Sequence, residues 1–280
     1  MAAHPAQGAG IIMKYNWIVT FLLMAIPSFA GERAPDPAAA PIFNGRDLDG
    51  WYVYTVQKQN ENPGIFTVVD GMLRVSGGEG DEAYYGGLIT KQEYSNYRLT
   101  FEYKWGEPTY GKRKGKARDS GVLLHCVGPN GPGPWMTSYE FQIIEGGTGD
   151  ILVVDTRTNK LESAAAPLSL VSEGFADGKQ RYFKAGGEKL EFVNSGRLNW
   201  WGRDPAWTDT TRFRGGKDVE SPFGEWTRCE VIARGDTLEY RVNDQLVNRA
   251  HKLSFTRGKL LFQTEGAEVW YRNIKLTPLK

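Results

Sequence analysis

Residues Arg98–Trp105 read RLTFEYKW, and apolar and polar side chains alternate strictly along this stretch. In an extended chain successive side chains point to opposite faces, so the alternation indicates a β-strand with one buried face. The apolar set consists of Leu99, Phe101, Tyr103 and Trp105. We therefore expect a sheet whose one face packs into a core.

Turn signals divide much of the remaining chain into further short strands. Asp70-Gly71 separates Phe66–Val69 from Met72–Val75, which is the pattern of a hairpin. Similar signals occur at Gly235-Asp236, Asn243-Asp244 and Glu265-Gly266-Ala267. Because no segment shows a long amphipathic helical pattern, the sequence predicts an all-β sandwich of two sheets.

The stretch Asp155–Pro222 differs from the rest because it has weak periodicity and several Gly and Pro residues. A connection this long in a compact domain is usually functional. It contains Trp200 and Trp201, which could contact a substrate. The alternative is a decorated loop, packed over one sheet face, whose Trp residues form a small satellite core.

The N-terminus has the order of a secretory signal peptide. Lys14 precedes the apolar run Trp17–Ile26, and Ser28-Phe29-Ala30 supplies the small residues; Met13 could be the true start. An apolar run of about ten residues is shorter than the ~20 needed to span a bilayer. We expect residues 1–30 to be a signal peptide, 31–41 a linker and 42–280 a single domain, exported to the periplasm or beyond the cell.

Charge and composition restrict the partners. The formal net charge is +1, and residues 1–30 hold one Lys and no acidic residue, so the mature chain is neutral. Such a chain gains little from polyanions, so no nucleic-acid partner is expected. The basic stretch Lys112–Arg118 is expected to be a solvated turn, or else to face a substrate carboxylate or phosphate. The 35 Trp, Tyr and Phe residues (9 + 13 + 13) fill a β core first, but they also suit stacking on sugar rings.

The Cys and His inventory is small. Cys126 and Cys229 could form a disulfide in an oxidising compartment, or remain two buried free thiols. With only His125 and His251 after residue 30, no Cys/His metal cluster is expected. No cofactor is predicted, although scattered carboxylates could hold a divalent cation such as calcium.

The segment Tyr139–Glu145, YEFQIIE, is the first candidate for chemistry. Glu140 and Gln142 share one face of a strand, opposite Phe141 and Ile143. Glu145 joins them only if a β-bulge inserts a residue after Gln142. Two carboxyl groups on one face would suit a retaining glycosidase, which needs them ~5–5.5 Å apart. The alternative is a polar outer face that leads into a Gly-rich turn.

A second strand, Ser120–Val127, places Gly121, Leu123 and His125 on one face by alternation. If it neighbours the first strand, His125 could approach Glu140 or Gln142 and act as a general acid/base. A hydrogen-bonded structural histidine is the alternative. Arg118, in the turn before this strand, could bind a substrate oxygen.

Several blocks together resemble the 3-keto-disaccharide hydrolase domain family. The blocks are Ile42–Trp51, Gly87–Tyr94, Asp119–Val122, Tyr139–Ile143, Gly224–Trp226 and Phe262–Ile274. They occur in family order and span about residues 42–279. The resemblance implies a secreted bacterial jelly-roll sandwich of the concanavalin A-like lectin/glucanase type.

The resemblance also implies hydrolysis or eliminative cleavage of glycosides oxidised at C3. A ketone at C3 acidifies the C2 proton, so such an enzyme needs a base near C2 and an acid near the glycosidic oxygen. On this hypothesis His125 or Glu140 is the base and Glu145 the other acid/base. Gln142 would orient the sugar, helped by Arg118 or Lys91.

Three alternatives stay open at this point, one of them a purely structural exported domain. An ordinary retaining glycosidase would use Glu140 and Glu145. A non-catalytic carbohydrate-binding domain of lectin type would bind sugars without turnover.

Overall fold

The computed structural model describes residue 1 and residues 40–130, 133–157 and 166–280. The described residues after position 36 belong to one compact unit. The predicted signal peptide after Met1, and the linker before residue 40, lie outside the described residues, so both stay predictions. In the part of the chain that is described, no helix is long and apolar enough to cross a membrane.

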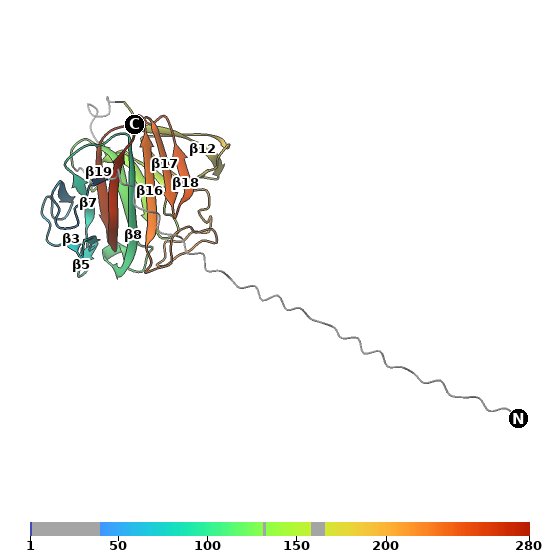
Figure 1. Ribbon diagram of the computed structural model, residues 1–280, viewed down its shortest axis with the longest axis horizontal. Helices are drawn as coiled ribbons and strands as arrows, with labels where there is room; N and C mark the ends of the chain where they lie inside the picture. Colours follow the sequence, from blue (N-terminus) through green and yellow to red (C-terminus); the bar gives the residue numbers. More distant parts are fainter. Residues whose placement is uncertain (2–39, 131–132, 158–165) are drawn as a thin grey trace. The chain divides into compact units, whose positions relative to one another are not determined.

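The described residues form two large antiparallel sheets and one small one (Figure 1). The order in the eight-stranded sheet is β18 (Gln245–Ala250), β17 (Thr237–Val242), β16 (Thr227–Arg234), β8 (Tyr97–Thr109), β20 (Ala267–Pro278), β4 (Met72–Val75) and β3 (Phe66–Val69), with β1 (Ala40–Pro41) paired to β20. The order in the ten-stranded sheet is β13 (Gln180–Phe183), β12 (Ser169–Asp177), β14 (Glu188–Val193), β15 (Ser195–Leu198), β11 (Ile151–Val154), β10 (Thr137–Ile144), β9 (Asp119–Val127), β19 (Lys259–Glu265), β7 (Tyr85–Thr90) and β2 (Trp51–Thr55). A small sheet pairs β5 (Gly78–Glu79) with β6 (Glu82–Ala83), and a 3₁₀ turn, η1, spans Gly111–Arg113.

The predicted strand pattern is confirmed. β8 contains the alternating stretch, and its side chains alternate between buried and half-buried. Asp70 and Gly71 both have positive φ between β3 and β4, as a tight hairpin turn requires. The chain crosses from the ten-stranded sheet to the other between β7 and β8, and again between β19 and β20. The architecture is the all-β, two-sheet jelly-roll sandwich expected from the sequence.

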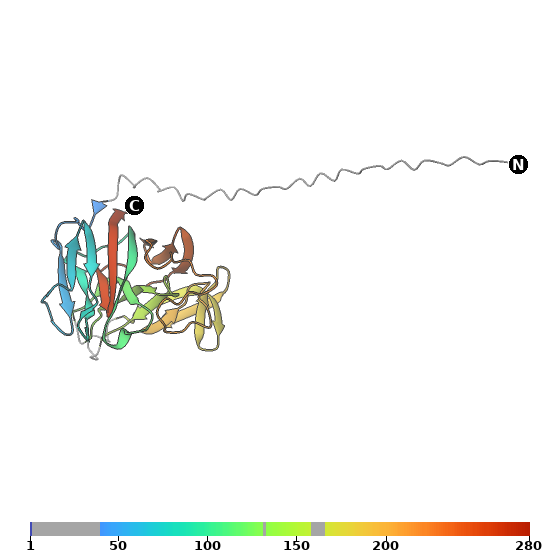
Figure 2. The ribbon, with the colours of Figure 1, turned by 90° about the horizontal axis from the view of Figure 1, so that it is seen from below.

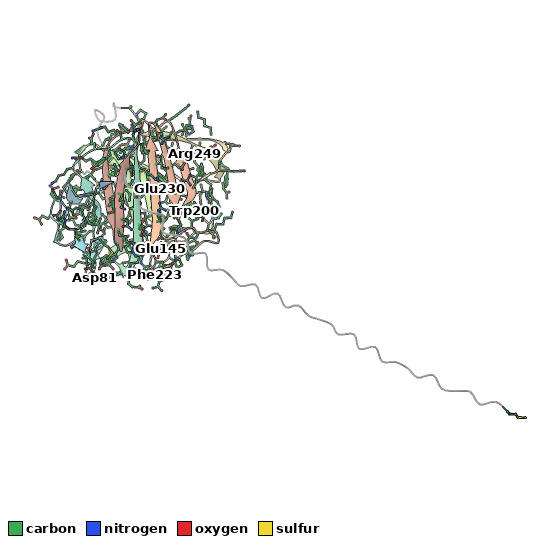
Figure 3. The ribbon with its side chains drawn as sticks, in the orientation of Figure 1. Asp81, Glu145, Trp200, Phe223, Glu230 and Arg249 are labelled. Carbon is green, nitrogen blue, oxygen red and sulfur yellow. The ribbon has the colours of Figure 1, made fainter. Side chains whose placement is uncertain are left out.

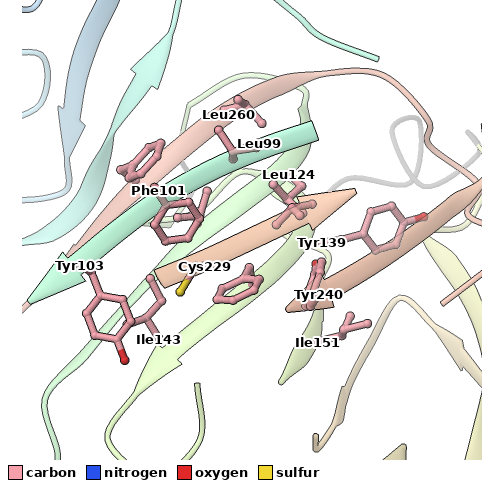
Figure 4. Packing of buried hydrophobic residues seen from close by; sticks show 14 of the residues in the cluster. Leu99, Phe101, Tyr103, Leu124, Tyr139, Ile143, Ile151, Cys229, Tyr240 and Leu260 are labelled. Carbon is pink, nitrogen blue, oxygen red and sulfur yellow. The ribbon is translucent and has the colours of Figure 1, made fainter. Parts of the chain in front are cut away.

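The core lies between the two sheets (Figure 4). Phe101 of β8 meets Phe141 of β10 edge to face, with ring centroids 5.7 Å apart, and Phe141 meets Tyr240 of β17 at 4.7 Å. Each such side chain contributes about 1.5–3 kcal/mol by leaving water. These contacts fix which face of β10 is turned inward.

The region Asp155–Pro222 was expected to be an inserted loop, and that expectation is wrong for much of it. Strands β12 to β15 lie within it and extend the ten-stranded sheet. Figures 1 and 2 show this part, in yellow, on the opposite side of the unit from the blue strands near β3. β14 has exposed Glu and Lys residues and only two buried side chains, which weakens its apolar signal.

The two cysteines are buried free thiols, so the disulfide alternative is wrong. Cys229 lies in the main core. Cys126 lies in a second apolar cluster together with Ile89, Leu123 and Leu261.

Candidate functional site

Strand β10 separates apolar from polar side chains as predicted. Tyr139, Phe141 and Ile143 belong to the core. Glu140 and Gln142 alternate with them and therefore share the other face of the sheet. They are nevertheless buried, with only 4% and 3% of their surfaces exposed.

Neighbouring strands bring further polar groups to this face. Gln142 pairs with Gly121 of β9. Phe262 of β19 pairs with Val122 of β9, so the next residue, Gln263, lies beside Gly121. Two residues further along, Glu265 of β19 and Asp119 of β9 occupy the same face. We call Asp119, Glu140, Gln142, Gln263 and Glu265 the carboxylate cluster.

Gly121 allows two members of this cluster to approach each other. A β-carbon at Gly121 would collide with Oε1 of Glu140 and would lie 2.6 Å from Oε1 of Gln263. The side chains of Glu140 and Gln263 thus meet over the space that a larger residue would fill.

Hydrogen bonds hold the polar groups in place but leave two acceptors free. Gln142 Nε2 donates to Asp119 Oδ1 at 3.0 Å. Arg113 pairs with Asp119 and, at 3.2 Å, with Glu265. Neither Gln142 Oε1 nor Gln263 Oε1 has a hydrogen-bond partner among the described residues. A buried carbonyl oxygen without a donor is costly, so each of these two oxygens has the capacity to accept one hydrogen bond from a water or a hydroxyl group.

The two glutamates have raised pKa values. Burial, and next the charge of Glu265, raise the pKa of Glu140 to about 8, against the opposing effects of Arg197 and of a hydrogen bond from Gln263. Burial raises the pKa of Glu265 to about 7, while Arg113 and Arg197 oppose the shift. Carboxyl groups with such values can exchange protons near neutral pH.

Arg197 of β15 is the second cation near these carboxyl groups. It lies two strands from Glu140, because it pairs with Leu152, which pairs with Glu140. Its Nε is 3.8 Å from Asp150 Oδ2, and a third of its side chain is exposed. It therefore has donors available for a ligand beside the cluster.

Tyrosines border the cluster on the side of β7 and β2. Tyr85 pairs with Glu265, and Gly87 lies between Gln263 and Tyr54. Both tyrosines are half-buried. Half-exposed aromatic rings beside carboxyl groups are suited to stacking against sugar rings.

His125 does not approach Glu140, and the predicted shared face is wrong. The register of β9 shifts here against both of its neighbours, β10 and β19. Leu123 pairs with Leu261 and Cys126 with Lys259, so two residues of β9 lie opposite one residue of β19. His125 has φ of 51° at this bulge. Its ring packs against Tyr97 and Tyr139 in the core, and Nδ1 lies 3.1 Å from the Phe255 carbonyl oxygen. We assign it no catalytic role.

Glu145 also lies apart from Glu140. The pairing of β10 with β9 is regular from Gln142 to Ile144, so the required bulge is absent there. Glu145 instead accepts hydrogen bonds from the Arg118 guanidinium and from the backbone amides of Arg118 and Arg212. Arg118 is 1% exposed, and its guanidinium lies over Phe223. Figure 3 shows Glu145 and Phe223 near the same end of the unit, where they line a small pocket. Arg118 and Glu145 are bound to each other rather than to the cluster.

The other predicted contacts lie elsewhere. Lys91 is exposed and has Asp49 as an ion-pair partner at 3.8 Å. Trp200 is buried in the core, although its backbone amide donates to Asp150. Trp201 is 39% exposed, and its indole donates to the Leu246 carbonyl. Of the eight predicted site residues, Glu140 and Gln142 come together in the carboxylate cluster, whereas Arg118 and Glu145 pair with each other away from it.

Sequence reasoning missed Asp119, Gln263 and Glu265 as site residues. One signal was available, because Gln263 and Glu265 sit two residues apart in β19, directly after the apolar run Leu260–Phe262. Their proximity to Glu140 depends on strand order, which no local pattern specifies.

A metal site is not evident in the described residues, where no group of three or more His, Cys, Asp or Glu is arranged to hold an ion. This observation does not test the expectation that no cofactor binds, nor the alternative of a divalent cation such as calcium.

Comparison with known proteins gives the following. A family model described as the 3-keto-alpha-glucoside-1,2-lyase-like domain matches residues 38–277. No curated protein matches the chain. The solved structures that match include a proposed glycosyl hydrolase from Parabacteroides distasonis, with a TM-score of 0.49 and 20% identity over 87% of this chain and 94% of that one. They also include a Bacillus licheniformis β-glucanase, with a TM-score of 0.45 and 10% identity over 87% and 99%.

Proposed function

We propose that this chain, which belongs to the 3-keto-alpha-glucoside-1,2-lyase-like domain family, cleaves glycosides oxidised at C3 by acid/base chemistry at the carboxylate cluster. The family membership supports a carbohydrate-active function. The observation that carries the proposal is the pair of carboxyl groups, Glu140 and Glu265, with pKa values raised to about 8 and about 7 beside two free amide acceptors.

The two pKa values divide the roles. Near pH 7.5 Glu265 is mostly ionised and serves as the base, whereas Glu140 is mostly protonated and serves as the acid. Glu265 takes the C2 proton, which the C3 ketone acidifies. The C2–H electron pair forms the C1–C2 double bond as the C1–O bond breaks, and Glu140 protonates the departing oxygen.

The first step yields the free aglycone and an unsaturated 3-keto sugar. Glu265 now carries a proton and Glu140 has lost one, so the pair is set for the reverse transfer. If water adds across the C1–C2 bond, Glu140 accepts a proton from it and Glu265 returns its proton to C2. Both carboxyl groups are then restored, and the net reaction is hydrolysis.

Arg197 is suited to stabilising the charge that develops on the C3 oxygen. It is the partly exposed cation whose charge acts on both glutamates. A preorganised donor at a developing oxyanion typically contributes about 10²–10³-fold in kcat. Gln142 and Gln263 would accept hydrogen bonds from the sugar hydroxyls.

The test compares a plain glycoside with its 3-keto counterpart at pH 7.5, using NMR to follow release of the aglycone and loss of the C2 hydrogen. We expect turnover of the 3-keto sugar alone, lowered about 10²–10⁴-fold in Glu140→Gln and retained in Glu145→Gln. Equal or faster cleavage of the plain glycoside would contradict the eliminative route. Binding of either sugar without product would instead favour a lectin.

A secretory role is a separate proposal, which rests on the charged, apolar and small-residue order of Lys14–Ala30. Cell fractionation with and without residues 1–30 tests it; retention of the full chain in the cytoplasm would contradict it.

A further inference from the structure

Arg113, at the end of η1, joins carboxylates from separate parts of the chain. Its Nη2 faces Asp119 at the start of β9 and Glu265 at the end of β19, the latter at 3.2 Å. Its Nη1 lies 3.3 Å from Oδ1 of Asp209, in the loop that follows β15. The side chain is only 16% exposed, so solvent screens these pairs weakly.

The stem of Arg113 is confined by Gly266. A β-carbon at Gly266 would lie 3.1 Å from Cγ of Arg113 and 3.2 Å from Cβ of Ala83. Gly266 also has φ of 74°, which favours glycine. Because Gly266 has no side chain, the residue directly after Glu265 leaves room for the aliphatic part of the Arg113 side chain.

The loop after β15 is attached to the basic turn by further contacts. Lys116 Nζ lies 3.4 Å from Asp209 Oδ2, and Thr211 Oγ1 donates to the Lys116 carbonyl at 3.0 Å. The stretch Lys112–Arg118, which was expected to be a solvated turn, is therefore bound to the loop after β15, and its Arg113 side chain points toward the carboxylate cluster.

We propose that Arg113 is a positioning residue that keeps Glu265 ionised and oriented toward the sugar. This inference rests on the proposed function, because it deepens the role of Glu265 as base. The charged and titratable groups near Glu265 are Arg113 from η1, Arg197 from β15, Glu140 from β10, Asp119 from β9 and Tyr85 from β7. Among them, Arg113 makes the ion pair with Glu265.

The neighbouring Lys114 provides a matched control, since it pairs with Asp81 at the surface and not with the cluster. We would compare wild type, Arg113→Gln, Arg113→Lys and Lys114→Gln by NMR titration of the ¹³C-labelled glutamate carboxyls. Glu265→Gln assigns the resonance. The pH dependence of kcat/KM is measured on the same proteins.

Arg113→Gln is expected to raise the Glu265 titration midpoint by at least about one pH unit, a tenfold change in proton affinity, and to move the acid limb of activity equally. Arg113→Lys should shift it less, and Lys114→Gln should leave it unchanged. If Arg113→Gln does not fold, Arg113→Lys carries the test.

An unchanged midpoint in a folded Arg113 variant would overturn the inference, whatever the turnover. An equal shift in Lys114→Gln would overturn it as well, because the effect would then be one of general charge. The titration needs no substrate, so it tests the Arg113–Glu265 pairing separately from the proposed function. If the Glu265 midpoint shifts in Arg113→Gln but the wild-type protein shows no turnover, the pairing is supported and the proposed function is contradicted.

Discussion

The Arg118 guanidinium donates to Glu145 Oε1 at 2.7 Å, and both side chains are buried. Glu145 also receives two backbone N–H groups, from Arg118 and Arg212. A carboxylate that accepts this many hydrogen bonds is fixed in place by its partners and has a structural role.

Removing one partner of this ion pair should destabilise the fold. Arg118→Leu leaves Glu145 buried without its counter-ion, and we expect a loss of about 3–5 kcal/mol in the free energy of unfolding. Urea denaturation measures this change. Glu145→Gln should lower stability while leaving kcat/KM of the folded fraction within about a factor of two. A hundredfold loss of kcat/KM in folded Glu145→Gln would restore Glu145 as a catalytic candidate.

The two glutamates of the cluster predict a bell-shaped pH dependence. Activity should fall below about pH 7 as Glu265 gains a proton, and above about pH 8 as Glu140 loses one. Glu140→Gln should lower kcat/KM by about 10²–10⁴-fold and abolish the alkaline limb. Steady-state kinetics from pH 5 to 10 provide the check, and an alkaline limb that persists in Glu140→Gln would exclude Glu140 as the acid.

Gly121 should be intolerant of a methyl group for reasons of space. In Gly121→Ala the new β-carbon would displace Glu140 and Gln263, at a cost of about 1–3 kcal/mol from overpacking. We expect at least a tenfold fall in kcat/KM, because a small displacement of a catalytic carboxyl is costly. Gly216→Ala is the control, since its β-carbon would meet no atom within 4 Å. Wild-type kinetics in folded Gly121→Ala would show that the position of Glu140 is not critical.

His125 predicts a pH dependence of stability rather than of activity. Burial lowers its pKa from 6.5 to about 4. Between these values the unfolded chain binds a proton that the folded chain does not, so stability falls as the pH drops from about 6.5 to 4. His125→Gln removes the imidazole, so the stability of this variant, measured by thermal unfolding, should depend less on pH between about 4 and 6.5. An unchanged slope over that interval would contradict the assignment.

Local sequence patterns were sufficient for much of the fold. The alternation of RLTFEYKW requires a one-sided strand, and Asp70-Gly71 supplies the two positive φ angles of a hairpin. The same rule placed Glu140 and Gln142 on one face. The half-exposed strands β12 to β15 escaped this reasoning, because their exposed charged residues leave a weak apolar pattern.

The sequence by itself therefore determined the all-β class, the core face of β10 and the polar face that carries Glu140, since each depends on residues close together in the chain. Tertiary structure alone decided which polar residues lie next to Glu140. Pairing of β9 with β10 and β19 brings Asp119, Gln263 and Glu265 to that face, and the bulge at His125 turns its ring into the core. Strand order and a one-residue bulge depend on contacts between separate segments, of which β19 lies more than a hundred residues from β9 and β10 in the chain. Alternation along a single strand contains no information about such contacts.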